Sequence, residues 1–264
     1  MATKPTKPVI KPYLRGSWHG REATRKGFKL IFSILFISFL YLLLGLMLSF
    51  DSLVLRVLTA SILIGFAALY MYFQGANNGE SDTAFAEIMY EHEQDGKAVV
   101  PVDRDHCFHP AKGFYEIMIA LIPFLLLTLV FAVLAQPITY SLGLLPSWLD
   151  APAQQTHVGE ALAYYSVNDA SMFMSILRIA ARAVTMPFIN VALHLGAGGV
   201  LWAERLTPLW VALAPLAYGL GYMQGPKLRI KINTGIKIGI HNKKRKERKA
   251  RNARATGRKP EQLI

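Results

Sequence analysis

Charged residues are scarce in this chain of 264 residues. Only 17% of them are Asp, Glu, Lys or Arg, whereas 53% are hydrophobic. This balance excludes an ordinary soluble domain, in which about a quarter of the residues are charged. Apolar runs of about 20 residues, the length that a helix needs to cross the hydrocarbon core, alternate with short charged segments. The composition therefore predicts a helical membrane protein.

Cysteine and the common catalytic motifs are also missing. Cys107 is the only cysteine, which excludes an internal disulfide bond and a Cys-rich zinc site. The sequence has no G-x-x-x-x-G-K-[ST] phosphate loop, no G-x-S-x-G and no N-x-[ST] glycosylation acceptor. No pattern therefore names a reaction, and we expect a non-enzymatic protein without a cofactor.

Four apolar runs have the length of membrane-spanning helices: 30–50, 53–73, 114–136 and 206–224. Only a short turn around Asp51 separates the first two, so residues 30–73 should form an antiparallel transmembrane hairpin. Pro123 lies inside the third run, where neighbouring helices can satisfy the freed carbonyl. We predict an all-α, polytopic helical integral membrane protein with these four spans and a kinked Arg-bearing segment at 171–205.

The charges are distributed unevenly and predict the topology. Residues 1–29 hold eight Lys or Arg against one Glu, and residues 225–264 hold 14 against two. Residues 74–113 instead carry eight Asp or Glu against three Lys or Arg, and residues 137–170 contain no Lys or Arg. Basic segments near span ends stay in the cytoplasm. We therefore expect both basic ends and the acidic loop 74–113 to be cytoplasmic, and 137–170 to be external, in a plasma membrane of bacterial type.

The segment 171–205 is apolar but carries two arginines. With both chain ends inside, the number of crossings must be even, so this segment should cross twice, giving six crossings, or form a re-entrant or interfacial helix, giving four. At about 100° per residue, one face gathers Ser175, Arg178, Arg182 and Thr185. One interpretation is an aqueous groove in which the arginines bind an anionic group. The other is an interfacial helix whose arginines extend to lipid phosphates.

The acidic loop holds a turn signal, Asn77-Asn78-Gly79, followed by a helical pattern over 81–96. Ser81 or Asp82 could cap this short amphipathic helix, and Gly96 could end it. We expect the residues after Gly96 to form extended chain that leads back to the membrane. Glu116, at the start of the third span, could meet a cytoplasmic arginine or the basic cluster 225–231.

Several potential metal ligands occur in the same loop: His92, His106, Cys107 and His109. Imidazole and thiolate groups suit zinc or copper, but structural zinc sites favour repeated pairs two to four residues apart. Adjacent residues of an extended chain point in opposite directions, as would His106 and Cys107. The alternative interpretation is a polar loop beside the membrane.

The C-terminal tail has two parts. Residues 228–240 alternate apolar and polar residues around Asn233-Thr234-Gly235, a pattern typical of a β-hairpin, with a helix or coil as the alternatives. Residues 241–259 contain ten Lys or Arg and one Glu. We expect this run to contact anionic headgroups at the cytoplasmic face of the bilayer through Lys243, Lys244, Arg245, Lys246, Arg248 and Lys249. The run has no aromatic residues to stack on bases, so nucleic acid is not the expected partner.

These observations define a class of function rather than an activity. We predict a transport-associated or membrane-assembly component of the plasma membrane, in which Arg178 and Arg182 contact an anionic group and a second membrane protein is a possible partner. One alternative is a metal-handling protein or membrane enzyme that uses the loop 92–109. The other is a membrane anchor that contacts RNA or the ribosome through the basic tail.

Overall fold

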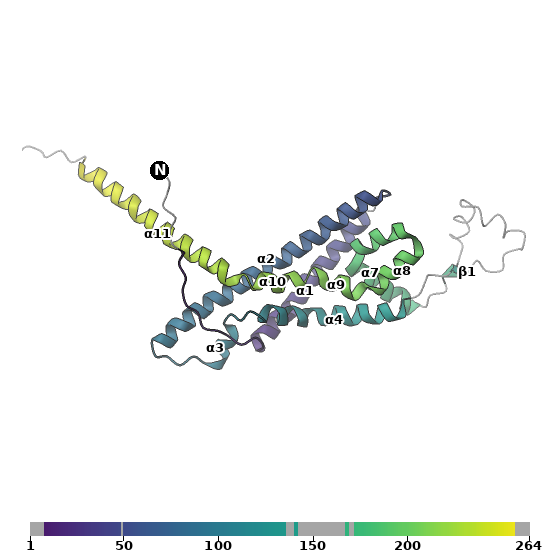
Figure 1. Cartoon of the computed structure of the whole chain (residues 1–264), viewed down its shortest axis with the longest axis horizontal. Helices are drawn as coiled ribbons and strands as arrows, with labels where there is room; N and C mark the ends of the chain where they lie inside the picture. The colour runs from purple at the N-terminus through teal and green to yellow at the C-terminus, as the bar shows by residue number, and fades with distance from the viewer. Residues whose placement is uncertain (1–7, 49, 136–139, 142–166, 169–171, 257–264) are drawn as a thin grey trace, which may run out of the picture. The chain divides into compact units, whose positions relative to one another are not determined.

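The computed structural model of the chain describes residues 8–48, 50–135, 140–141, 167–168 and 172–256 (Figure 1). Most of the predicted external loop 137–170 lies outside these residues. The elements in chain order are α1 (Arg21–Met47), α2 (Leu53–Gln94), α3 (Pro101–His106), α4 (Lys112–Leu134), β1 (Tyr140–Ser141), β2 (Val167–Asn168), α7 (Met172–Ala192), η2 (Leu193–Leu195), α8 (Gly196–Arg205), α9 (Thr207–Leu213), α10 (Leu216–Tyr222) and α11 (Gly225–Thr256). The two-residue strands pair antiparallel. The all-α prediction is confirmed.

Among the residues that the structure describes, four helical stretches are long and apolar enough to span a membrane: Arg21–Met47, Leu53–Gln94, Lys112–Leu134 and Met172–Leu195. The first three contain predicted spans, and the fourth is the Arg-bearing segment. The run 206–224, predicted as one span, is divided between α9 and α10. Pro215 stands between them, where its ring and missing N–H prevent a regular helix from continuing.

The second helix is much longer than expected. α2 continues without a break from Leu53 to Gln94, so the turn predicted at 77–79 and the separate helix at 81–96 are wrong. Gly96, with a φ of +76°, follows its end as expected. The apolar residues 53–73 suffice to cross the hydrocarbon. Residues 74–94 therefore extend about 32 Å further as a helix that carries most of the acidic residues.

Two other segments differ from the sequence-based expectation. The chain after Gly96, predicted to be extended, contains the short helix α3, which has Pro101 at its first position. The β-hairpin predicted at 228–240 is wrong, because these residues belong to the 32-residue helix α11. The alternation of Ile with Lys and Arg did not reveal that Arg229 and Asn233, four residues apart, both bind Glu87 of α2.

The contacts divide the chain into two compact units. Unit 1 comprises Met1–Lys26, Met71–Glu116 and Ala217–Ile264, and unit 2 comprises Gly27–Tyr70 and Ile117–Leu216. Unit 1 holds most of the polar contacts, described below. In unit 2, Phe131 of α4 packs with Ala135 and with Ala181 of α7, and a second cluster joins Ile189 and Ala192 of α7 to Ala203 of α8.

Candidate functional site

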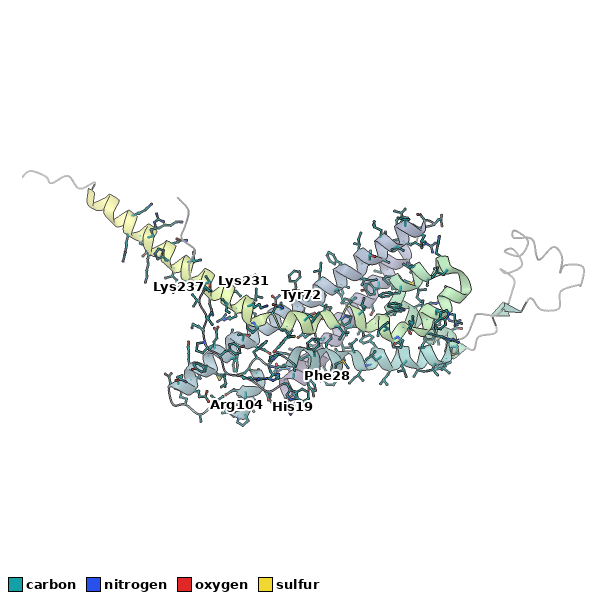
Figure 2. The ribbon with its side chains drawn as sticks, viewed as in Figure 1. His19, Phe28, Tyr72, Arg104, Lys231 and Lys237 are labelled. Atoms are coloured by element: carbon teal, nitrogen blue, oxygen red, sulfur yellow. The ribbon has the colours of Figure 1, made fainter. Side chains whose placement is uncertain are left out.

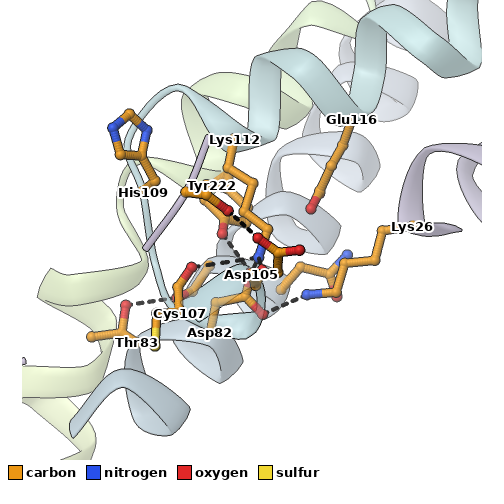
Figure 3. A network of polar contacts seen from close by, with 12 residues as sticks. Lys26, Asp82, Thr83, Asp105, Cys107, His109, Lys112, Glu116 and Tyr222 are labelled. Carbon is orange, nitrogen blue, oxygen red and sulfur yellow. Dashed lines mark hydrogen bonds and ion pairs between the residues drawn. The ribbon is translucent and has the colours of Figure 1, made fainter. Parts of the chain in front are cut away.

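A fully buried charge of unit 1 is Lys112, the first residue of α4, which has no exposed surface. Its Nζ lies 2.8 Å from Oδ2 of Asp82 on α2, 2.8 Å from the carbonyl oxygen of Asp105 and 3.4 Å from that of Cys107. These acceptors match the three hydrogens of an ammonium group. Lys112 is therefore a structural cation that ties the start of α4 to α2 and to the end of α3 (Figure 3).

Asp82 is the centre of this network. Its Oδ1 accepts a hydrogen bond from Lys26 of α1, and its Oδ2 accepts one from the Tyr222 hydroxyl of α10 at 2.5 Å, besides the bond from Lys112. The sequence suggested Asp82 only as a helix cap. In the structure its carboxylate instead joins residues from four helices (Figure 3), because a buried carboxylate is stable only where several donors replace water.

A second buried carboxylate, Glu116, lies one turn further along α4. Its Oε2 accepts a hydrogen bond from the Tyr218 hydroxyl at 2.6 Å, and the same hydroxyl accepts one from Asn78 of α2 at 2.9 Å. The expectation that Glu116 meets an arginine or the cluster 225–231 is therefore wrong, because a tyrosine of α10 takes that position. Asn78, predicted in a turn, is a donor on the inner face of α2.

Glycines allow α2 and α10 to approach this closely. A Cβ added to Gly75 would lie 2.1 Å from the carbonyl oxygen of Tyr218, and one added to Gly79 would lie 2.2 Å from that of Tyr222. On the other side, a Cβ on Gly221 would lie 2.0 Å from the carbonyl oxygen of Tyr72. Gly75 and Gly79 form a G-x-x-x-G pattern, which lets two helix backbones touch. This contact positions Tyr218 and Tyr222 over Glu116 and Asp82.

The acidic half of α2 also binds the first part of α11. Arg229 donates to Glu87 at 2.9 Å and to Glu80 at 3.0 Å, and Asn233 donates to Glu87 at 2.9 Å. Burial opposes the charge of Arg229, but the hydrogen bonds to both carboxylates outweigh it and raise its pKa. The acidic segment that stood out in the sequence is therefore neutralised in part by the start of the basic tail.

The N-terminal segment 8–20 is an ordered strap on unit 1 rather than a free basic end. The Leu14 amide donates to the Ala86 carbonyl of α2 at 3.1 Å, and the Gly16 amide donates to the Phe108 carbonyl at 3.0 Å. The Ser17 hydroxyl donates to Asp105 at 2.5 Å, and the Val9 amide donates to the Thr234 hydroxyl of α11 at 3.0 Å. The strap thereby connects α2, α3 and α11.

Unit 2 contains the two arginines that the sequence singled out. Both bind one carboxylate, that of Glu204 on α8: Arg182 contacts its Oε1 at 2.8 Å through Nε and at 2.6 Å through Nη2, and Arg178 lies 3.3 Å away. The Glu204 side chain is 2% exposed and that of Arg182 is 29% exposed. An anionic group was expected at this place, and within the described residues the chain itself supplies one.

The predicted kink lies at Thr185, where φ is −120° and ψ is 17°, just before Pro187. The Thr185 hydroxyl donates to the Ala181 carbonyl of its own helix at 2.9 Å, so it stabilises the bend instead of pointing at a ligand. Ser175 is half-buried one turn before Arg178. Beyond the kink, α7 and α8 form a helical hairpin that Glu204 closes.

The His and Cys residues of the loop 92–109 have separate environments. The Cys107 thiol is buried and donates to the Asp103 carbonyl, and burial raises its pKa to about 11. His106 lies against Phe85, while burial and then the nearby charges of Arg15 and Lys112 lower the pKa of His109. His92 lies in the last turn of α2. Among the described residues, no three His, Cys, Asp or Glu side chains gather in a group that could hold a metal ion.

A scan against protein-family models found no match to this chain, and comparisons with curated proteins and with solved structures found none either.

The residues that sequence reasoning missed share one signal. Asp82, Lys112 and Glu204 are charged residues near the ends of helical apolar segments, and charged side chains are fully buried only when paired. Their partners lie far away in the sequence, so the pattern could identify the residues but not the pairs. The G-x-x-x-G spacing of Gly75 and Gly79 was also visible in the sequence, but the adjacent asparagines made the same stretch resemble a turn.

Proposed function

We propose that this protein is a non-enzymatic component of a membrane-assembly or transport system, in which the α7–α8 hairpin binds an anionic group of a substrate, lipid or partner protein. The observation that supports this proposal is the cluster of Arg178, Arg182 and Glu204 within an apolar segment. Charges in such segments are costly and usually face a cavity or a partner.

Arg182 is the residue that would meet the anionic group. Its Nε and Nη2 bind Glu204, and nearly a third of its side chain remains exposed. Among the described residues, Glu204 is its only acidic partner. A guanidinium has five donors and holds carboxylates and phosphates in a fixed geometry. Glu204 therefore orients Arg182 and leaves further donors for a second anion.

Arg205 provides a matched control on the same hairpin. It follows Glu204 directly, carries the same charge and is exposed. The substitutions Arg182→Gln and Arg205→Gln each remove one positive charge, but only the first changes a residue that binds Glu204. A difference between the two variants therefore reports on the cluster rather than on net charge.

The experiment compares thermal unfolding of detergent-solubilised protein with added phosphatidylglycerol or phosphatidylcholine. We expect phosphatidylglycerol to stabilise the wild type and Arg205→Gln more than Arg182→Gln, with no such difference for phosphatidylcholine. In cells that lack the protein, Arg205→Gln should restore the lost function. Arg182→Gln should not restore it. The proposal is contradicted by two results together. Phosphatidylglycerol would stabilise Arg182→Gln as much as Arg205→Gln, and Arg178→Ala/Arg182→Ala would fully complement the deletion.

A further inference from the structure

Four carboxyl side chains are buried among the residues that the structure describes: Asp82, Glu87, Glu116 and Glu204. The first two and the last form ion pairs with lysines or arginines. Glu116 has no exposed surface, yet it takes part in none of the ion pairs found in the described part of the chain. Burial without a paired cation favours the neutral, protonated form of a carboxyl group.

The two oxygens of Glu116 have different surroundings. Oε2 accepts the hydrogen bond from the Tyr218 hydroxyl at 2.6 Å, and the Tyr218 oxygen in turn accepts one from the Asn78 amide at 2.9 Å. Oε1 is buried and has no hydrogen-bond partner among the described residues. Because Oε2 acts as an acceptor, a proton on this carboxyl group belongs on Oε1. An ionised Glu116 would leave a charged oxygen in the interior without a donor, which is unfavourable.

The packing of α10 holds the Tyr218 hydroxyl at this carboxyl group. A Cβ added to Gly221 would lie 2.0 Å from the carbonyl oxygen of Tyr72 on α2, which is labelled in Figure 2, and one added to Gly219 would lie 2.5 Å from the ring of Phe114 on α4. α10 therefore packs closely against both helices. The fixed hydroxyl can donate to Glu116 in either protonation state, and its hydrogen bond becomes stronger when the acceptor is ionised.

Two lysines lie near Glu116 but bind other groups. Three oxygens accept the three hydrogens of Lys112, and Lys26 binds Asp82. In Figure 3 the Glu116 side chain extends from α4 toward this cluster. Burial opposes the ionisation of Glu116, the charges of both lysines favour it, and the charge of Asp82 opposes it. The two lysines and Asp82 leave one surplus positive charge, which an ionised Glu116 would balance. The site can therefore both hold a proton and release it.

We propose that Glu116 is a proton-binding site, whose Oε1 carries a proton near neutral pH and releases it to water at higher pH. After release, the Tyr218 hydroxyl still donates to Oε2, and the surplus charge of Lys26 and Lys112 balances the new carboxylate. All groups that take part belong to unit 1. The proposal is therefore independent of the arginine cluster on α7.

Infrared spectroscopy of the full-length protein in nanodiscs tests this site, because the C=O stretching band of a protonated carboxyl group lies apart from the amide bands. Exposed glutamates lose their proton near about pH 4.3, so at about pH 6.5 they are ionised. We expect the band at about pH 6.5 in the wild type, and its reversible loss by about pH 9. Glu116→Gln should lack the band. The matched control Glu87→Gln, which changes a buried glutamate paired with Arg229, should retain it.

Tyr218 and Tyr222 provide a second matched pair. Both are fully buried on α10, but Tyr218 donates to Glu116 and Tyr222 donates to Asp82. Tyr218→Phe removes the donor that stabilises the ionised carboxylate, so the pH at which half of the band is lost should rise by about one to two units. Tyr222→Phe should change it much less. Circular dichroism and gel filtration check that each variant folds. If Glu116→Gln does not fold, Glu116→Asp keeps the acid and should shift the frequency of the band.

Three results would overturn the proposal. The first is a carboxyl band at about pH 6.5 that is the same in the wild type and in the Glu116 variant, because Glu116 would then be ionised. The second is a band that persists unchanged at about pH 9, because the proton would then not be exchanged. The third is an equal shift in Tyr218→Phe and Tyr222→Phe. None of these results bears on Arg182, so the proposed function is tested separately.

Discussion

The ammonium of Lys112 lies 2.8 Å from Oδ2 of Asp82, and both side chains are buried. Removing one member of such a pair leaves the other as an uncompensated buried charge, which costs about 3–5 kcal/mol. We therefore expect Asp82→Asn to lower the free energy of unfolding by about this amount, measured by denaturation in detergent. Asp95→Asn, an exposed site in the same acidic segment, should change it little. Equal stability of the two variants would show that the pair is not essential.

Close contact between α2 and α10 predicts a large effect from one methyl group. Gly75→Ala and Gly221→Ala would each place a Cβ about 2 Å from a backbone carbonyl oxygen, which cannot move without separating the helices. Overpacking of this kind costs about 1–3 kcal/mol. The control is Gly65→Ala on the same helix, where a Cβ meets nothing within 4 Å. This control should leave stability unchanged or raise it by up to about 1 kcal/mol. Thermal unfolding of the three variants measures the difference.

Glu204 should matter for stability because it holds two guanidiniums. In Glu204→Gln the neutral amide no longer offsets their charge, so we expect the unfolding temperature in detergent to fall. Adding Arg178→Gln to Glu204→Gln should recover part of this loss, since it removes one of the two cations. A double-mutant cycle measures this coupling. Strictly additive effects would mean that Arg178 and Glu204 do not interact.

Cys107 should react slowly with thiol reagents. The thiolate is the reactive form, and the buried Cys107 has a pKa raised to about 11. We expect little modification by a maleimide at pH 7.5 in the folded protein and rapid modification after unfolding in dodecyl sulfate. A single cysteine placed at the exposed residue Ser52, in a Cys107→Ser background, provides the labelling control. Fast labelling of native Cys107 would place its thiol in contact with water.

Much of the fold was predictable because it depends on local composition. The apolar runs at 30–50, 53–73 and 114–136 predicted three of the long helices, and the polar stripe singled out the Arg-bearing segment. The errors lie where polar residues are buried. Asn77, Asn78 and Gly79 favour a turn in water, but against α10 the glycine permits close contact and Asn78 bonds to Tyr218. Residues 228–240 favour a strand by alternation, but α2 offers two carboxylates to one face of a helix.

The candidate site was predicted only in part. The stripe of Arg178 and Arg182 identified the cations, and the need for an anionic partner followed from the cost of burying charge. That partner could not be found in the sequence, because Glu204 lies beyond the kink and a helical turn. The four ligand-type residues of the loop 92–109 were identified by type alone, and the fold places them in different surroundings.

The sequence by itself determined the class of this protein, because hydropathy and charge act residue by residue. It also located the arginines of α7 and the basic end of α11. Only the tertiary structure decided which charges meet: Asp82 with Lys26, Lys112 and Tyr222, and Glu204 with both arginines. It also decided that the first part of α11 binds the acidic half of α2. The physical reason is that pairing of buried charges depends on distance in space, which a linear pattern of residue types does not contain.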